Sequence, residues 1–123
     1  MTTPPYLAGH IYWVENLPPL DGTDPGRHPA VLYELIDDIE CLVIGITTTV
    51  CDEHIDFDQV EMSNLLDDPG ATTGLRERCV ALPRWLVPVF RSQLVEHAGW
   101  LPKVTIIQLF DAVMERIDGS DHV

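Results

Sequence analysis

Apolar and β-branched residues fall in short runs along the first half of the chain, separated by segments rich in proline, glycine and aspartate. The runs GHIYWVENL (9–17) and PAVLYELI (29–36) have the composition of β-strands, and prolines border them. The run IECLVIGITTT (39–49) is almost continuously apolar, which predicts a strand covered on both faces. The two aspartates at 37–38 predict a short hairpin between the last two strands.

The middle of the chain predicts further strands around a loop. HIDFDQVEM (54–62) alternates polar and apolar residues, as a strand with one solvated face does. The segment 63–74 is rich in turn residues and predicts a loop. Residues 78–90 predict one or two strands, and Pro83 and Pro88 place them at sheet edges or bulges.

The end of the chain has helical character. The stretch 91–101 predicts a short helical turn that ends at Gly99. From Lys103 to Ile117, apolar residues recur at helical spacing, and Gly119 then predicts the helix end. The fold class expected is mainly β, with five or six short strands closed by a C-terminal helix. We expect one domain over residues 1–123, with an ordered core at about residues 8–118.

Charge narrows the possible partners. Seven Lys and Arg against 20 Asp and Glu give a net charge of −13, which repels phosphate backbones at long range. This counts against extensive nucleic-acid binding but leaves room for a small local site. No Lys or Arg occurs before Arg27, and four arginines cluster later: Arg76, Arg78, Arg84 and Arg91. This cluster either binds phosphate or consists of solvated charges that balance nearby acids.

The three cysteines form no CxxC pair, which argues against a disulfide framework or zinc site. Cys41 and Cys79 lie in apolar runs typical of the core. Cys51 lies near His54, and a surface turn is the simpler interpretation than a metal site. We therefore expect no metal and no cofactor.

Membrane insertion and export are not predicted. No apolar run approaches the roughly 20 residues of a membrane span. The N-terminus MTTPPYLAG lacks the features of a signal peptide, which makes the cytoplasm the expected location.

The loop DGTDPGRHPAVL (21–32) carries the candidate chemistry. It places Arg27 and His28 side by side before Pro29. Arginine binds phosphate as a permanent, bidentate cation, whereas histidine titrates near neutrality and can act as acid or base. The alternative is an exposed turn with an incidental ion pair from Arg27 to Asp21 or Asp24.

The order of these motifs resembles the MazF/PemK/Kid toxin family. Over roughly residues 9–117 the chain contains, in this order, GHIYWVENLPP, a glycine-containing loop into RHPAVL, a strand ending in ITTT, TGLRERCVAL and a closing helix. The resemblance implies a small SH3-like barrel of the CcdB/PemK type. It also implies a homodimer that cuts single-stranded RNA and is neutralised by an antitoxin protein.

The resemblance also suggests site residues. The family usually has a catalytic Arg directly before the proline of the second strand, but here that position is His28, with Arg27 one place earlier. The family's Thr or Ser at the end of the third strand corresponds best to Thr48, which Thr47 and Thr49 flank. An acidic residue of the first loop, present in some members, is nearest to Asp24. The expected substrate-binding residues are Arg76, Arg78 and Arg84.

Two functions stay open at this point. Metal-free RNA cleavage needs a base for the attacking 2′-hydroxyl, a cation for the phosphorane charge and an acid for the leaving oxygen. Either Arg27 binds the phosphate and His28 transfers protons, or catalysis is lost. In the second case the barrel is a binding module that sequesters an antitoxin or binds gyrase as CcdB does. Trp13, Trp85 and Trp100 could stack on bases, although tryptophans of so small a barrel are more often core.

Overall fold

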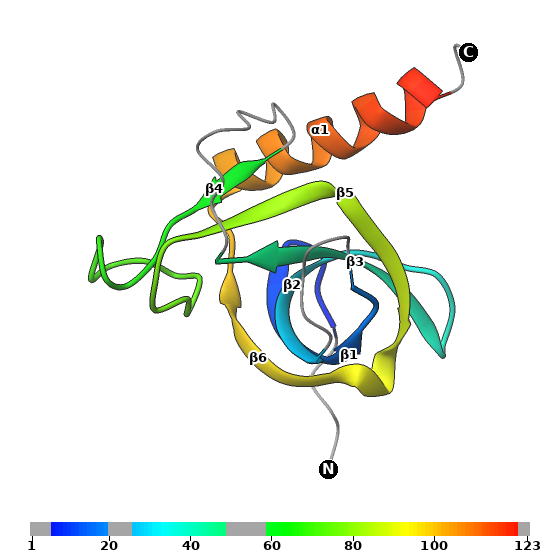
Figure 1. The fold of residues 1–123 in the computed structure, drawn as a ribbon, viewed down its shortest axis with the longest axis horizontal. Helices are drawn as coiled ribbons and strands as arrows, with labels where there is room; N and C mark the ends of the chain where they lie inside the picture. Colours follow the sequence, from blue (N-terminus) through cyan, green and yellow to red (C-terminus); the bar gives the residue numbers. More distant parts are fainter. Residues whose placement is uncertain (1–5, 20–25, 49–58, 121–123) are drawn as a thin grey trace.

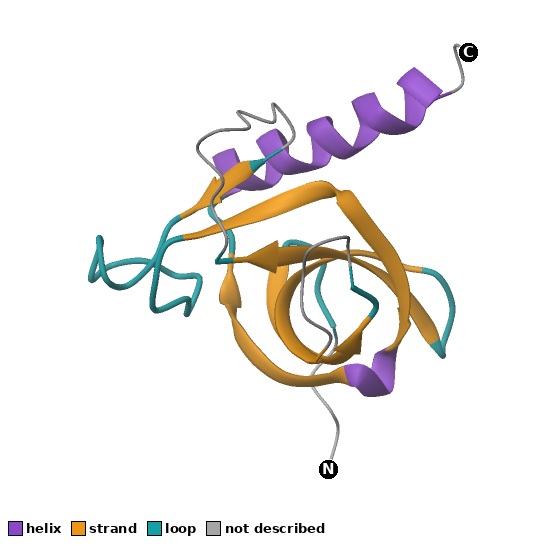
Figure 2. Cartoon of the chain, in the orientation of Figure 1, coloured by secondary structure: helices purple, strands orange, loops and turns teal. Residues whose placement is uncertain are grey.

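A computed structural model describes residues 6–19, 26–48 and 59–120, which form one curled antiparallel sheet and a C-terminal helix (Figure 1). The sheet order is β4-β5-β3-β2-β1-β6. Its strands are β1 (His10–Leu17), β2 (Gly26–Leu35), β3 (Glu40–Thr47), β4 (Val60–Met62), β5 (Cys79–Phe90) and β6 (Leu94–Trp100). The 3₁₀ turn η1 (Arg91–Gln93) joins β5 to β6, and the helix is α1 (Lys103–Ser120). The predicted fold class, mainly β with a C-terminal helix, is confirmed (Figure 2).

Two apolar cores lie on opposite faces of the sheet. The first joins strand residues such as Ile11 and Ile44 to Leu109 and Val113 of α1. The second surrounds the buried Trp85. Neighbouring positions of β1 and β3 alternate between the two cores, because successive side chains of a strand point to opposite faces. This explains the continuous apolar run of β3, both of whose faces are buried as predicted.

The hairpin between β2 and β3 lies where the two aspartates predicted it. The side-chain Oδ1 of Asp37 accepts hydrogen bonds from the backbone N–H groups of Ile39 (2.8 Å) and Glu40 (2.7 Å). These bonds satisfy the turn's donors and hold the pKa of the Asp37 carboxyl below its usual value. The turn chemistry was therefore readable from the sequence.

β2 begins earlier than the sequence indicated. It was expected from residue 29, but the strand starts at Gly26 because Gly26 and residues 28–31 pair with β1. Arg27 and His28 therefore belong to a strand and not to the preceding loop. Their side chains are consequently placed by the sheet.

β5 is one continuous strand of 12 residues, and its prolines lie where the ladder tolerates them. Pro83 falls in the irregular stretch between the pairs Ile46–Ala81 and Ile44–Leu86. Pro88 lies beyond the part of β5 that pairs with β4, so one side of the strand needs no donor there. The expected position at edges or bulges is confirmed.

Two predictions near the end of the chain are wrong. The stretch 91–101 is helical only at η1 and then becomes β6, because pairing with β1 satisfies its backbone. Gly119 does not end the helix, since α1 continues through it to Ser120. In the first case a tertiary pairing overrides the local pattern.

The segment 63–78 is irregular, as the loop prediction required for 63–74, and it packs against β6. The Trp100 N–H donates to the Thr72 carbonyl (2.9 Å), and the Thr72 hydroxyl donates to the Trp100 carbonyl (2.9 Å). Gly74 adopts a φ of 74°, and a Cβ there would lie 2.0 Å from the Ala98 carbonyl oxygen. This close approach fixes the loop beside β6 and forms one wall of a pocket.

Within the described ranges, no helix combines the length and the apolar character needed to cross a bilayer.

Candidate functional site

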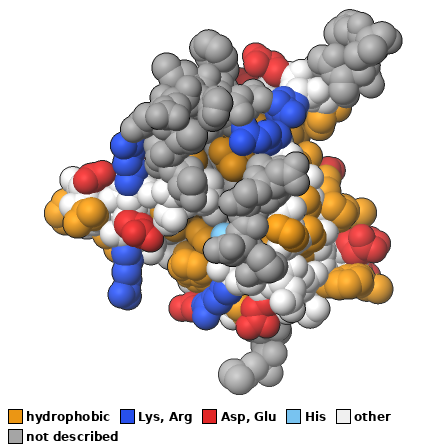
Figure 3. Space-filling view, viewed as in Figure 1, with side chains coloured by type: hydrophobic (Ala, Val, Ile, Leu, Met, Phe, Trp, Pro, Cys, Tyr) orange, Lys and Arg blue, Asp and Glu red, His pale blue; other side chains and the backbone are white. Residues whose placement is uncertain are grey.

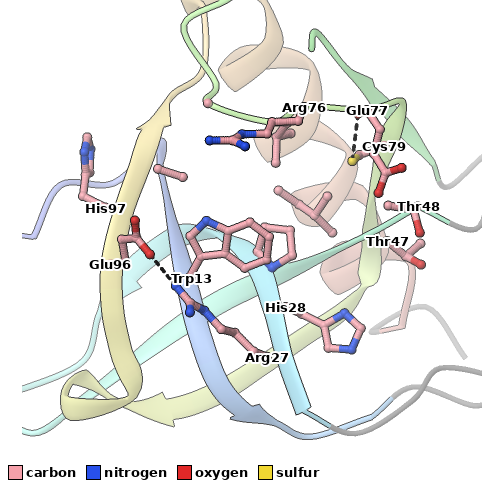
Figure 4. A pocket seen from close by; sticks show the side chains of 15 residues that line it. Trp13, Arg27, His28, Thr47, Thr48, Arg76, Glu77, Cys79, Glu96 and His97 are labelled. Atoms are coloured by element: carbon pink, nitrogen blue, oxygen red, sulfur yellow. Dashed lines mark hydrogen bonds and ion pairs between the residues drawn. The ribbon is translucent and has the colours of Figure 1, made fainter. Parts of the chain in front are cut away.

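An open pocket of about 890 Å³ lies between the start of β2, the end of β3, the loop around residues 74–77, and β6 (Figure 4). β2 and β3 are antiparallel, with Ala30 opposite Gly45, so the start of one strand lies beside the end of the other. The polar and aromatic lining residues are Trp13, Arg27, His28, Thr47, Thr48, Arg76, Glu77, Glu96 and His97. The sheet thus brings together residues far apart in sequence.

Arg27 is held by two neighbours. Its guanidinium carbon lies 5.2 Å from the centre of the Trp13 ring, and its Nη2 forms an ion pair with Glu96 Oε2. Trp13 and Glu96 are directly opposite each other on β1 and β6, and Arg27 reaches them from β2 (Figure 4). The acidic partner of Arg27 in the structure is thus Glu96, on another strand. The proposed partners Asp21 and Asp24 lie outside the described residues.

His28 leaves β2 in a different direction. Its ring meets the edge of Trp85, at 5.4 Å between ring centroids and an interplanar angle of 73°. Figure 4 shows the Arg27 guanidinium beside Trp13 and Glu96, and the His28 imidazole turned away from them. Consecutive strand positions point to opposite faces, so the two residues reach the pocket from different sides of β2.

Thr47 and Thr48 line the pocket from the end of β3. The Thr47 side chain is buried, whereas Thr48 is exposed. Of the two, Thr48 therefore offers its hydroxyl to a bound ligand. Thr49 lies outside the described residues, as do Asp24, Cys51 and His54.

The three arginines expected to bind substrate do not lie together in the structure. Arg76 lines the pocket. Arg78 forms an ion pair with Glu61 of β4 (Nε to Oε1, 3.0 Å), and neither residue lines the pocket. Arg84 is exposed on β5 and is also not among the lining residues. The fold therefore does not form a continuous strip of arginines.

Sequence reasoning missed the two acidic residues of the pocket, Glu77 and Glu96. Glu96 lies in the stretch expected to be helical, so no strand alternation was available to place it. Of the tryptophans, Trp85 is core (1% exposed), Trp13 is partly exposed in the pocket and Trp100 is 48% exposed.

His97 contributes to the pocket wall, but its ring lies on the other side of β6 (Figure 4). There its Nε2 is 2.9 Å from Nδ1 of His10, a hydrogen-bond distance. Partial burial, and secondarily the charge of His97, lower the pKa of His10. The His10 ring in turn lies beside Trp100, at 6.2 Å between ring centroids.

The pocket cysteine is not suited to nucleophilic chemistry. Burial, with a smaller contribution from Glu77, raises the pKa of Cys79 to about 11. Its thiol is then protonated at neutral pH, and only thiolates are good nucleophiles. Among the described residues, no group of three or more His, Cys, Asp and Glu is arranged to hold a metal ion.

Basic side chains do not form one broad field on the face shown in Figure 3, where blue and red atoms are interspersed. This agrees with the net charge of −13. Any phosphate contact at the pocket therefore depends on a few arginines placed individually, which here are Arg27 and Arg76.

The architecture matches that of solved toxins. MazF from Deinococcus radiodurans superposes with a TM-score of 0.66 at 17% identity, covering 91% of this chain and 94% of that one. The chain has the fold of MazF toxins. An endoribonuclease from a Mycobacterial species, solved with its cognate antitoxin, gives a TM-score of 0.66 at 14% identity, covering 93% of this chain and 96% of that one. Mycobacterium tuberculosis toxin MazF-mt6 gives a TM-score of 0.61 at 18% identity, with 89% and 96% covered.

No family model matches the sequence, and neither does any curated protein. The likeness to MazF toxins is thus carried by the fold, at identities where side chains have diverged widely.

Proposed function

We propose that the protein is the toxin of a toxin–antitoxin pair and cuts single-stranded RNA without a metal ion. The observation that carries this proposal is the meeting of Arg27, His28 and Thr48 in one pocket of a MazF fold. The neighbour described as an endoribonuclease in complex with its cognate antitoxin supports the same activity and partner.

The residues supply the groups that the reaction requires. A base takes the proton of a 2′-hydroxyl, whose oxygen forms a bond to the adjacent phosphorus. The bond from phosphorus to the 5′-oxygen then breaks, and that oxygen receives a proton. The products are a 2′,3′-cyclic phosphate and a free 5′-hydroxyl.

Each role falls to a residue of the pocket. Arg27 binds the phosphate and stabilises the negative charge of the phosphorane, because guanidinium donors fit phosphate oxygens. His28 exchanges protons with the reacting 2′- and 5′-oxygens, since imidazole can act both as a base and as an acid. The Thr48 hydroxyl donates a hydrogen bond to a phosphate oxygen, and Arg76 binds a neighbouring phosphate.

The test is incubation of the purified protein with a long single-stranded RNA in the presence of EDTA, followed by mapping of the cut ends. We expect discrete cuts, and losses of about 10²-fold or more in His28→Ala and Arg27→Ala. Glu61→Ala is the matched control, because it breaks an exposed Arg–Glu pair outside the pocket. Intact RNA at high protein excess would contradict the proposal.

A non-catalytic binding module is the second candidate. His28 occupies the position before Pro29 where the resembled family has arginine, and Arg27 is already paired with Glu96. Under this alternative the protein sequesters an antitoxin or contacts gyrase. A pull-down from cell extract would then recover a cognate antitoxin peptide or a topoisomerase, and the RNA assay would show no cutting.

We also propose that the toxin acts in the cytoplasm as a homodimer. Support for dimerisation comes from the exposed apolar residues of α1, which are Val104, Ile107, Met114 and Ile117. Such a row on one helix is an unusual surface for a monomer. Light scattering should give the mass of two chains, and a mass of one chain would contradict a dimer.

A further inference from the structure

Arg27 would be a mobile side chain without its two contacts. Its side chain is 48% exposed, and a long arginine loses considerable rotamer entropy when it is held in one place. Trp13 covers one face of the guanidinium, and Glu96 accepts from Nη2. A guanidinium has five N–H donors, so donors remain for a phosphate.

The geometry of the strand explains why Arg27 needs its contacts with Trp13 and Glu96. Arg27 stands one residue before His28, and adjacent residues of a strand point to opposite faces. Arg27 therefore needs neighbours on its own face to direct it toward the pocket. β1 and β6 supply Trp13 and Glu96 at directly opposed positions (Figure 4).

We propose that Glu96 is a positioning residue for RNA cleavage: together with Trp13 it orients the Arg27 guanidinium toward the scissile phosphate. This inference rests on the proposed function. Glu96 itself does not touch the RNA in this mechanism, and it acts only through Arg27.

An acidic residue beside a phosphate site is otherwise unfavourable for phosphate binding. The two interpretations of Glu96 therefore predict opposite effects of its removal. If Glu96 did not position Arg27, it would only compete with the phosphate for the guanidinium and repel it. Removing Glu96 would then improve RNA binding and cleavage. If Glu96 positions Arg27, its removal lowers both.

The experiment compares Glu96→Ala, Glu96→Gln, Arg27→Ala and the double variant Arg27→Ala/Glu96→Ala. Two quantities are measured: kcat/KM for RNA cutting, and the Kd of an oligonucleotide made non-cleavable by a 2′-deoxynucleotide at the cut site. We expect Glu96→Ala to lower kcat/KM about tenfold, within the range of coupling between contacting residues. Glu96→Gln should retain most of the activity, because its amide oxygen still accepts from Arg27.

The double variant identifies the route of the effect. In the Arg27→Ala background, loss of Glu96 should have no further effect on kcat/KM, because the group it positions is gone. Glu61→Ala removes the acid of the other exposed Arg–Glu pair, with similar side-chain exposure (61% against 62% for Glu96), and should leave cleavage unchanged.

Three results would overturn the proposal. The first is cleavage or binding that improves in Glu96→Ala. The second is an effect of Glu96→Ala that is equally large without Arg27. The third is a Glu96→Gln variant as inactive as Glu96→Ala whose pH–rate profile has lost one limb, which would make Glu96 a proton-transfer group.

Failure of the proposed function is recognised separately. Absence of cutting by the unaltered protein would overturn that function, and with it any role of Glu96 in cleavage. NMR signals of the Arg27 guanidinium need no RNA: they should report a restricted side chain in the unaltered protein and a mobile one in Glu96→Ala. A restricted side chain in both would show that Glu96 does not order Arg27.

Discussion

Arg27 and His28 show how strongly one step along a strand changes the surroundings of a side chain. Arg27 meets Trp13 and Glu96, whereas His28 meets the edge of the buried Trp85. The proposed division of work, phosphate binding by Arg27 and proton transfer by His28, follows from this difference. A residue's neighbours across the sheet therefore decide its role more than its neighbours in sequence.

Gly45 is the residue on which the position of Trp85 depends. A Cβ at this position would lie 2.1 Å from Cε3 of the Trp85 ring, in the second core. Gly45→Ala should therefore destabilise the protein by about 1–3 kcal/mol, as overpacking of a core does. Urea denaturation measures the free energy of unfolding.

The control for this prediction is Gly70→Ala. A Cβ at Gly70 meets only a side-chain oxygen of Asp68, at 3.4 Å, and φ there is not positive. We expect a change within about 0.5 kcal/mol for Gly70→Ala, which is usual for surface positions. Equal stability of the two variants would show that the Trp85 ring can move aside at little cost.

Among the elements, helix α1 carries one buried row and one exposed row of apolar residues. Leu109 and Val113 pack into the first core with residues of β1 to β5, while Val104 is 75% exposed. The helical periodicity of 103–117 predicted the helix but not which apolar residues face the sheet. That stretch holds nine apolar residues, which are too many for a single buried row.

Leu109→Ala should destabilise the protein by about 2–5 kcal/mol, because Leu109 is fully buried and its loss leaves a cavity. Val104→Ala on the same helix should change the stability by no more than about 0.5 kcal/mol in the monomer. Thermal unfolding of both variants at low protein concentration measures the difference. A loss of stability for Val104→Ala that grows with protein concentration would instead place Val104 in the dimer contact.

The whole molecule carries a net charge of −13, whereas its pocket is lined by only a few cationic side chains. The long-range field therefore opposes the approach of RNA, and binding must come from short-range contacts. This arrangement predicts an unusually weak dependence of RNA affinity on salt for a protein that cuts RNA.

With Arg27 and Arg76 as the phosphate contacts, log K against log salt concentration should have a slope of about −1.4, since each single-strand contact contributes about −0.7. The measurement is a salt titration of the non-cleavable oligonucleotide at pH 8. Arg76→Ala should make the slope shallower by about 0.7. A slope steeper than about −3 would reveal phosphate contacts outside the pocket.

Local sequence patterns were sufficient to predict the strand-rich class, β1, the hairpin at Asp37 and the C-terminal helix. These features depend on local preferences: alternation, turn residues and helical spacing act over a few residues, so they can be read along the chain. The order of motifs also predicted the MazF-like fold, although the identities to solved relatives are only 14–19%.

The composition of the pocket, in contrast, depends on tertiary contacts. Pairing with β1 turned the stretch expected to be a helical turn into β6, and this placed Glu96 opposite Trp13 and beside Arg27. The same fold paired Arg78 with Glu61, away from the pocket, and kept Arg76 inside it. Contacts between residues about 70 positions apart depend on strand register, which no local pattern in the chain encodes.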